Sequence, residues 1–292
     1  MRYAVTGATG WLGSAFFKSF ASTHPHDTFT VLAHRAMPSY PFPVTVVRGS
    51  LEDPTALSQF VDGADVVVHF AAITHAAQPE DYYRINADGT RHLLDRARAA
   101  GVQRFVFVST RAIADTIGAY GISKRQAEEY VMASGIPYTI ARFSEVYGPG
   151  YREGIGAFVR LVQRVPVVPY PMVSSAVAPL WYEDAVDALA RLVMRADLVN
   201  RIYTIAGPRS YTMRELHETM CRTGAMRRLL IPVPLRALGV VWWLSDLFGR
   251  PLFQYDQISR LACQKDDVID DAIRDIGFAP RSFEEGFRRL IA

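Results

Sequence analysis

Tyr120 and Lys124 are four residues apart in the segment AYGISK, which places them one turn apart if the segment is helical. An ammonium group beside a phenol favours the phenolate, and a free phenol otherwise titrates at about 10. A phenol placed in this way can act as acid or base in a proton transfer. The same spacing also occurs by chance on exposed helices, so its meaning depends on the surrounding elements.

A glycine-rich loop is the second pattern with chemical meaning. TGATGWLGS, residues 6–14, carries Gly7, Gly10 and Gly13 directly after an apolar strand and opens a helix. Glycines there permit a tight turn, close approach of the backbone to a pyrophosphate, and close packing of helix on strand. The helix N-terminus adds free N–H donors and a partial positive charge. The loop therefore predicts dinucleotide binding, with a plain tight turn as the alternative.

The elements around these patterns alternate between strands and helices. Apolar, β-branched runs predict strands at 2–7, 28–33, 44–49, 65–72, 104–110 and 138–142. Helical patterns lie between them at 12–22, 83–100 and 120–134. Because most of the strands are apolar on consecutive residues, they fit a parallel sheet covered on both faces. The predicted fold class is α/β, with a Rossmann-like, doubly wound parallel sheet.

The regular alternation of strands and helices ends after Gly148-Pro149-Gly150, where a proline-rich stretch begins. We therefore expect an NAD(P)-binding Rossmann domain at 1–150 and a smaller mixed C-terminal substrate lobe at 151–292. The strand at 201–207 is expected to rejoin the sheet. Helices are expected at 183–196, 213–223, 235–247 and 283–291. The lobe should close over the carboxyl edge of the sheet, where ligands bind in open α/β folds.

Composition excludes several classes of protein. The 292 residues are 50% hydrophobic, and the formal net charge is only +3, from 32 basic and 29 acidic residues. This small, dispersed excess argues against nucleic acid as a partner. Cys221 and Cys263 belong to no CxxC pattern, so neither a disulfide framework nor a metal site is expected. The chain begins with an apolar strand rather than a charged leader, so we predict a cytoplasmic protein.

The longest apolar stretch is residues 229–248. Pro232, Pro234, Arg236 and Asp246 interrupt it, so it is a poor membrane span. Contact with a membrane through an amphipathic helix remains an alternative to ordinary core or to the wall of a substrate pocket.

An ordered set of motifs gives these patterns a common origin. The set is TGATGWLG (6–13), VVVHFAA (66–72), NADGT (86–90), FVFVST (105–110), YGISKRQAEEYV (120–131), EVYGPG (145–150) and the tail 266–290. With these motifs the chain resembles the extended, NAD(P)-dependent epimerase/dehydratase-like branch of the short-chain dehydrogenase/reductase superfamily. It is most similar to the subgroup related to the accessory subunit of complex I. The resemblance implies Tyr120 as the acid/base, Lys124 as its partner, and Thr110 (or, as second choice, Ser109) as the hydroxyl that polarises the substrate oxygen.

The resemblance also implies the residues that surround the cofactor. They are Gly7, Thr9, Gly10, Trp11, Leu12, Gly13, His34, Arg35, Ser50, Leu51, Phe70, Ala71, Ala72, Asn86, Val108, Tyr120, Lys124, Phe143 and Ser144. Two of these assignments have structural alternatives, since Asn86 is equally suited to cap a helix and the apolar end of the fourth strand is equally suited to the core. His69 is interpreted as a core histidine rather than a catalytic group.

The end of the second strand bears on the choice of cofactor. An acidic residue about 20 positions beyond the glycine loop normally binds the adenosine ribose of NAD, but here Ala33 takes that place, followed by His34 and Arg35. No carboxylate would repel a 2′-phosphate, and a guanidinium could bind one. NADP is therefore predicted, with NAD as second choice; a solvated loop arginine is the alternative. Ser50 replaces the family's usual adenine-contacting aspartate.

Several departures from the family concern the substrate, for which Thr74, Thr110, Glu145 and Trp181 are the predicted contacts. Thr110 and Tyr120 are closer in sequence than in typical sugar-nucleotide epimerases, and Glu145 replaces an asparagine. No lysine or arginine occurs from 165 to 190, although Arg152 and Arg209 could compensate. These features disfavour a nucleotide sugar without excluding it. The aromatic-rich lobe allows instead a hydroxy or keto compound with an apolar body.

The sequence thus predicts an NAD(P)-dependent oxidoreductase with a Thr-Tyr-Lys triad, acting on a small hydroxy or keto substrate. Net reduction and transient oxidation with epimerisation would use the same residues. A sugar-nucleotide epimerase or reductase, a non-catalytic NAD(P)H-binding protein and a membrane-associated carrier remain as alternatives. A homodimer is compatible with the resemblance.

Overall fold

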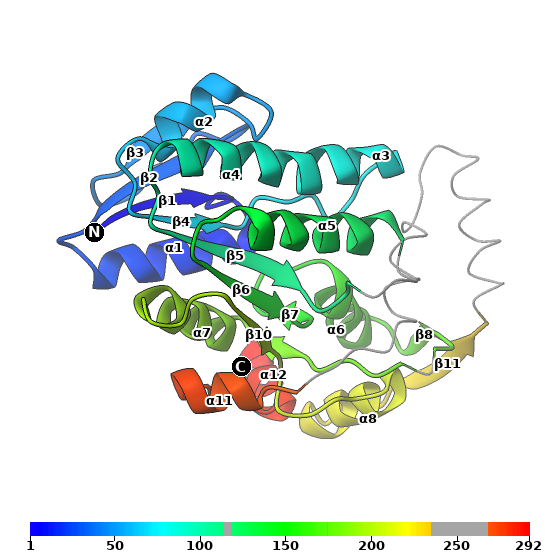
Figure 1. Cartoon of the computed structure of the whole chain (residues 1–292). Helices are drawn as coiled ribbons and strands as arrows, with labels where there is room; N and C mark the ends of the chain where they lie inside the picture. The colour runs from blue at the N-terminus through cyan, green and yellow to red at the C-terminus, as the bar shows by residue number, and fades with distance from the viewer. Residues whose placement is uncertain (114–117, 174, 235–267) are drawn as a thin grey trace.

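A seven-stranded parallel sheet forms the middle layer of the molecule. The structure, a computed structural model, describes residues 1–113, 118–173, 175–234 and 268–292 (Figure 1). The strand order is β10-β6-β5-β4-β1-β2-β3. The strands are β1 (Arg2–Thr6), β2 (Thr28–Ala33), β3 (Thr45–Arg48), β4 (Val66–His69), β5 (Arg104–Thr110), β6 (Tyr138–Phe143) and β10 (Arg201–Ile205). The predicted fold class is confirmed.

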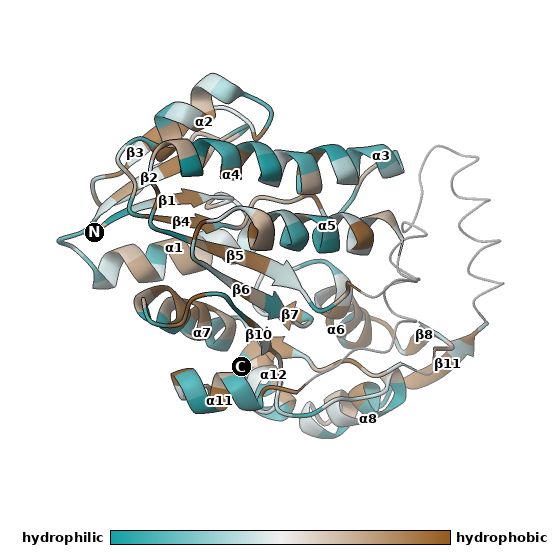
Figure 2. Ribbon diagram, viewed as in Figure 1, coloured by the Kyte–Doolittle hydropathy of each residue, from teal (hydrophilic) through white to brown (hydrophobic). Residues whose placement is uncertain are grey.

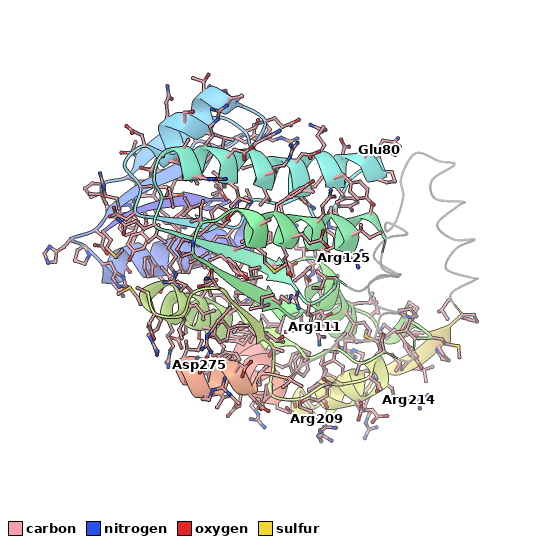
Figure 3. The ribbon with its side chains drawn as sticks, viewed as in Figure 1. Glu80, Arg111, Arg125, Arg209, Arg214 and Asp275 are labelled. Carbon is pink, nitrogen blue, oxygen red and sulfur yellow. The ribbon has the colours of Figure 1, made fainter. Side chains whose placement is uncertain are left out.

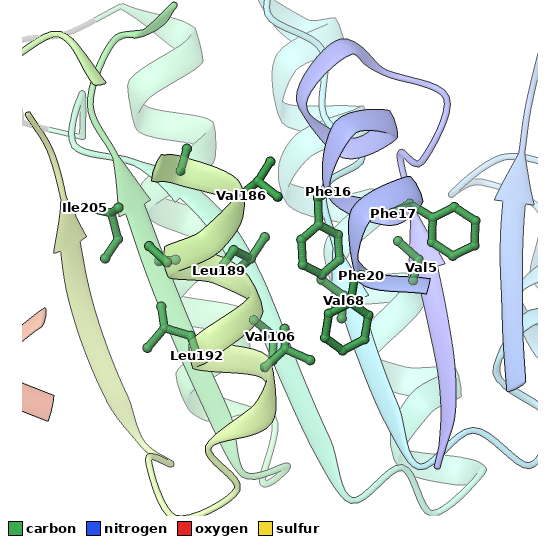
Figure 4. Packing of buried hydrophobic residues seen from close by; sticks show 14 of the residues in the cluster. Val5, Phe16, Phe17, Phe20, Val68, Val106, Val186, Leu189, Leu192 and Ile205 are labelled. Atoms are coloured by element: carbon green, nitrogen blue, oxygen red, sulfur yellow. The ribbon is translucent and has the colours of Figure 1, made fainter. Parts of the chain in front are cut away.

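Helices cover both faces of this sheet. Helices α1 (Trp11–Thr23) and α7 (Tyr182–Met194) lie on one face, where Phe16 and Phe20 of α1 and Leu189 of α7 pack over strand valines such as Val68 (Figure 4). Helices α2 (Pro54–Val61), α4 (Gly89–Ala99) and α5 (Ala119–Ala133) cover the other face. Both sides of a strand are therefore buried, which explains why Val66, Val67 and Val68 of β4 are consecutive apolar residues. Figure 2 shows the contrast between the apolar strands and the polar outer sides of α4 and α5.

A buried arginine fixes α7 to the sheet. Arg104 opens β5, and its guanidinium donates hydrogen bonds to the carbonyls of Leu192 and Val193 at 2.7 and 3.0 Å. These carbonyls belong to the last turn of α7, which lacks intrahelical donors. A cation at a helix C-terminus also interacts favourably with the helix dipole.

The smaller lobe has its own core and two short parallel sheets. Its helices are α6 (Gly154–Arg164), α8 (Met213–Thr223) and α12 (Phe283–Ile291), and its strand pairs are β7 (Val146–Tyr147) with β9 (Leu180–Trp181) and β8 (Val167–Pro171) with β11 (Leu229–Val233). Capping boxes at Thr212–Glu215 and Ser282–Glu285 start α8 and α12. Figure 3 shows Arg209 and Arg214 at the outer side of this region.

The second half of the chain contributes to both lobes. Strand β10 pairs with β6, helix α7 shares a face with α1, and α11 (Asp270–Ile276) lies beside α7 and β10. The described residues also include α3 (Pro79–Tyr82) and a π-helical turn, η1 (Tyr83–Asp88), ahead of α4. The expected helix at 235–247 and Cys263 lie outside the described residues.

Within the described residues, no helix is long and apolar enough to cross a membrane. Residues 229–233, the start of the longest apolar stretch, form strand β11 instead.

Candidate active site

The glycine loop brings three backbone segments into contact. Gly7 has a φ of +70°, and the amide of Gly10 donates to its carbonyl at 2.9 Å. A Cβ added at Gly7 would lie 2.7 Å from the amide nitrogen of Ala71, and one added at Gly13 would lie 2.3 Å from the carbonyl oxygen of Gly7. Only glycine therefore fits at both positions, and the backbone of Phe70 and Ala71 lies against the loop.

Helix α1 begins at this loop without a side-chain cap. Gly10 is the N-cap and supplies no oxygen to the first amides of the helix, which belong to Trp11, Leu12 and Gly13. Thr9 and Gly10 are exposed. Free amides, a helix dipole and a backbone cradle that a Cβ would fill are the features that a pyrophosphate requires. The residues present thus fit a dinucleotide.

The side chain of Trp11 points away from this cradle and connects it to the other lobe. Its Nε1 donates to the carbonyl of Pro149 at 3.0 Å, and its ring stacks on Tyr151 with 4.4 Å between ring centres. The cofactor contact predicted for Trp11 would therefore involve its backbone.

Tyr120 and Lys124 lie on one buried turn of α5. Tyr120 is the second residue of the helix and is 9% exposed; Lys124 is 3% exposed. The Lys124 Nζ donates to the carbonyl of Val108 at 2.9 Å and lies 4.0 Å from the centre of the Phe107 ring. Burial lowers the pKa of Lys124 from 10.5 to about 7, although the charge of Glu128 acts in the opposite direction.

Glu128 anchors a buried network that sequence reasoning missed. Its carboxylate, 1% exposed, accepts two hydrogen bonds from Arg142 Nε, at 3.0 and 3.1 Å, and one from the Arg142 terminal nitrogen at 2.5 Å. It also accepts a hydrogen bond from the hydroxyl of Ser109 at 2.5 Å. The signal in the sequence was the i+4 spacing from Lys124, which places both side chains on one helix face.

This network separates the two candidate hydroxyls at the end of β5. Ser109 donates its proton to Glu128, whereas the Thr110 oxygen accepts the amide proton of Ala112 at 3.1 Å. Among the described residues, no acceptor takes the hydroxyl proton of Thr110. Thr110 can therefore donate to a substrate oxygen while its own oxygen is held by the backbone.

Asn86 connects the loop after β4 to helix α5. Its side-chain oxygen accepts from the amide of Ile73 at 2.8 Å, and its nitrogen donates to the Ile73 carbonyl at 3.1 Å and to the Ser123 hydroxyl at 3.3 Å. Ser123 in turn donates to the carbonyl of Tyr120 at 2.8 Å. Asn86 lies inside the π-helical turn, so it is not a helix N-cap.

His69 is a fully satisfied core histidine whose tautomer follows from its neighbours. Thr90 donates its hydroxyl proton to the carbonyl of Asn86 at 2.6 Å, so His69 Nε2 must donate to the Thr90 oxygen at 2.9 Å. Nδ1 then accepts from the hydroxyl of Thr6 at 2.6 Å. The Thr6 oxygen accepts from the amide of Ala71 at 3.1 Å. Burial, together with the charge of Lys124, lowers the pKa of His69 to about 3.

The end of β2 leaves a free cation beside the predicted adenosine position. Ala33 ends the strand fully buried, and His34 and Arg35 follow as exposed residues. No carboxylate in the described part of the chain pairs with Arg35. Ser50 accepts the amide proton of Glu52 at 3.2 Å, and Leu51 is buried in the core beneath α2.

The predicted substrate contacts have different surroundings. Glu145 accepts from a terminal nitrogen of Arg111 at 2.5 Å, and the Arg111 side chain, only 3% exposed, lies near the carboxyl ends of β5 and β6 (Figure 3). Thr74 donates to Glu153 at 3.2 Å. Trp181, 3% exposed, packs on Tyr147 in the core of the small lobe, so its position lends no support to a substrate contact.

The remaining cofactor predictions lie along the same sheet edge. Phe143, which is buried, pairs in register with Thr110, and Ser144 donates its hydroxyl proton to the carbonyl of Ala178 at 2.7 Å. Ala72 follows Ala71 in the loop after β4, where it is partly buried. In the part of the chain that the structure describes, no group of three or more His, Cys, Asp or Glu side chains is placed to hold a metal ion.

Comparison with known proteins agrees with this architecture. The profile of the NAD dependent epimerase/dehydratase family matches residues 3–206. A ceramide reductase from Caulobacter vibrioides is 38% identical over 191 residues, which cover 64% of this chain and 59% of that protein, so the match spans about three fifths of the reductase. A UDP-glucose 4-epimerase from Vibrio cholerae is 24% identical over 98% of this chain and 93% of its own. A 2-alkyl-3-oxoalkanoate reductase from Stenotrophomonas maltophilia is 26% identical over 100% of this chain and 99% of its own.

Solved structures share the fold over the whole chain. A dTDP-glucose 4,6-dehydratase from Streptomyces venezuelae, solved with NAD bound, superposes with a TM-score of 0.77 at 23% identity, covering 100% of this chain and 96% of its own. A UDP-glucose 4-epimerase from Thermotoga maritima gives a TM-score of 0.75 at 19% identity, with coverage of 100% and 97%.

Proposed function

We propose that this chain, which belongs to the NAD dependent epimerase/dehydratase family, transfers hydride between a nicotinamide cofactor and a carbon that carries a hydroxyl or keto oxygen. One observation carries the proposal: Lys124 is buried one helical turn after Tyr120, with its Nζ at the end of β5, 2.9 Å from the carbonyl of Val108. Strongly shifted pKa values cluster at functional sites, so the pKa of Lys124, which burial lowers to about 7, supports this role.

The roles of the residues follow from the proton that accompanies the hydride. A bound nicotinamide supplies the hydride in the reducing direction and accepts it in the oxidising one. During reduction, the Tyr120 hydroxyl gives its proton to the substrate oxygen as the keto group becomes an alcohol. Thr110 donates a hydrogen bond to the same oxygen, where negative charge develops. In its protonated form Lys124 stabilises the phenolate that remains, and the negative charge of that phenolate in turn favours the ammonium form.

We favour a keto substrate with an apolar chain over a nucleotide sugar. Arg111, which follows the carboxyl end of β5, is already paired with Glu145, so the pair presents little net charge to a diphosphate. Residues 165–190 supply no other lysine or arginine. Two of the reductases that align with this chain are named for ceramide and for 2-alkyl-3-oxoalkanoates. The second candidate is sugar-nucleotide epimerisation, favoured by the alignment with a UDP-glucose 4-epimerase over 98% of this chain.

NADPH is the proposed reductant. The support is the exposed Arg35 after β2, which has no carboxylate partner among the described residues and follows the buried Ala33 where a carboxylate would exclude a 2′-phosphate. Calorimetric titration with NADPH and NADH measures the preference. Arg35→Ala should weaken NADPH binding by about tenfold and leave NADH binding unchanged. Equal losses for the two cofactors contradict the assignment.

The test of the reaction uses turnover with two substrates. Purified protein is incubated with NADPH and a long-chain β-keto ester, and separately with NAD⁺ and UDP-glucose. We expect stoichiometric NADPH oxidation with the first and no epimer with the second. Tyr120→Phe should lower kcat by about 10²–10⁴-fold. Tyr130→Phe removes a hydroxyl from the same helix and should not change kcat; wild-type turnover by Tyr120→Phe would disprove the mechanism.

A further inference from the structure

Strands β8 and β11 form a small sheet with one apolar face covered and the other open. They lie together at the edge of the molecule (Figure 1). Val168, which is fully buried, and the partly buried Leu230 join the core of the small lobe. On the opposite face, Val167 and Leu229 are neighbours in register and are 43% and 61% exposed, and Ile231 is 42% exposed. An apolar cluster open to solvent marks an interaction site.

Exposed arginines precede each of the two strands in the chain. The segments 160–173 and 224–234 contain Arg160, Arg164, Arg227 and Arg228 but no aspartate or glutamate. Arg228 donates to the carbonyls of Val162 and Gln163 at 2.9 and 3.3 Å, so it holds the start of β11 against the end of α6. Its neighbour Arg227 and the last residue of α6, Arg164, are exposed. No carboxylate of the described residues pairs with either.

Exposed apolar side chains together with unpaired arginines favour one kind of partner surface over another. A second copy of the chain, docked symmetrically, would bring the same arginines together without any carboxylate from these segments, and like charges would repel. An anionic bilayer offers both complements, since apolar side chains enter the boundary between headgroups and acyl chains while arginines reach the phosphates. We propose that the open β8–β11 face, with Arg164 and Arg227, docks this protein on an anionic phospholipid membrane.

The position of the face relates it to the candidate active site. The carboxyl ends of β5 and β6 point toward the side of the molecule on which β8 and β11 lie (Figure 1). A bilayer on this face would therefore lie on the side from which substrate reaches Thr110 and Tyr120. This relation rests on the proposed function, because it gives a reductase of apolar ketones direct access to membrane-borne substrate. The docking itself needs neither cofactor nor turnover.

Flotation of the full chain with vesicles tests the proposal. The wild-type protein should float with equimolar phosphatidylcholine and phosphatidylglycerol, and not with phosphatidylcholine alone. Ile231→Asp should lower the partition coefficient by about tenfold, because it places a charge in the apolar face. Arg227→Gln, which leaves the apolar face intact, should lower it by about fivefold.

Matched variants elsewhere on the surface control for nonspecific effects. Ile273→Asp changes an isoleucine of α11 that is 47% exposed, and Arg98→Gln removes an exposed arginine of α4; neither should alter flotation. The proposal is overturned if the wild-type protein does not float, or if the control variants lose as much affinity as the test variants. A wild-type dimer that Ile231→Asp dissociates, without vesicle binding, would show instead that the face joins two copies.

Discussion

The large parallel sheet with its glycine loop and the β8–β11 face of the small lobe differ in how their side chains are satisfied. Around His69, each hydrogen bond has a defined donor and acceptor, and the buried groups connect Thr6 at the glycine loop to Ser123 on α5. At β8–β11, apolar side chains lie open to solvent. The difference indicates that the first region is built to hold a fixed geometry, whereas the second has the exposed apolar face for which we proposed a membrane partner.

The strictest test of the fixed geometry is the glycine loop. Gly7 and Gly101 have nearly equal φ values, +70° and +72°, but a Cβ would meet backbone only at Gly7, since nothing lies within 4 Å at Gly101. Gly7→Ala should lower the free energy of unfolding by about 3 kcal/mol, and Gly101→Ala by about 1 kcal/mol from conformational strain alone. Urea unfolding measures both. Equal losses would mean that close approach of the backbone contributes nothing beyond φ.

The next test concerns the buried lysine. The folded protein holds the pKa of Lys124 at about 7, below the ordinary value of 10.5, so between these values the unfolded chain binds more protons. Stability from this group should therefore rise with pH across that window, by up to about 2 kcal/mol between about pH 7.5 and 9. Lys124→Met should remove this rise. Parallel stability curves for the two proteins would show that the lysine remains protonated in the fold.

The smallest expected effect comes from the open face. Ile231→Asp replaces a side chain that is 42% exposed on the outer strand pair, so it should change the free energy of unfolding by less than about 0.5 kcal/mol. A loss above about 2 kcal/mol would mean that the face belongs to the folded core. In that case the contrast between the two regions would disappear.

The strands of the large sheet and the glycine loop could be predicted from the sequence because short-range patterns determine them. Val66, Val67 and Val68 are apolar on successive positions since both faces of β4 are covered, and the glycines of the loop mark where no Cβ fits. Strand β10 was expected in the sheet, and it pairs with β6. In these segments the residue types follow from features common to the fold class, such as a covered strand or a tight turn.

Other parts were missed because their residues depend on distant partners. The run at 166–171 contains three prolines and no strand was predicted there, yet residues 167–171 form β8, since prolines are tolerated in a two-stranded edge. Strand β11 was hidden in a long apolar stretch because its open face is apolar as well. For Glu128 the sequence shows only its spacing of four residues from Lys124. Its ion pair with Arg142 could not be predicted without knowing that β6 lies beside α5.

Trp11 belongs to the helix that follows the glycine loop, and its side chain contacts the segment that leads into the small lobe. It is the first residue of the helix whose amides would face a pyrophosphate, while its ring lies on Tyr151 and its Nε1 bonds to Pro149. A ligand that favours one position of this residue changes the stability of its contact with Tyr151, and by reciprocity a change in that contact alters the ligand's affinity by the same free energy. The affinity of a dinucleotide for the glycine loop and the free energy of the contact between Trp11 and Tyr151 would therefore change together.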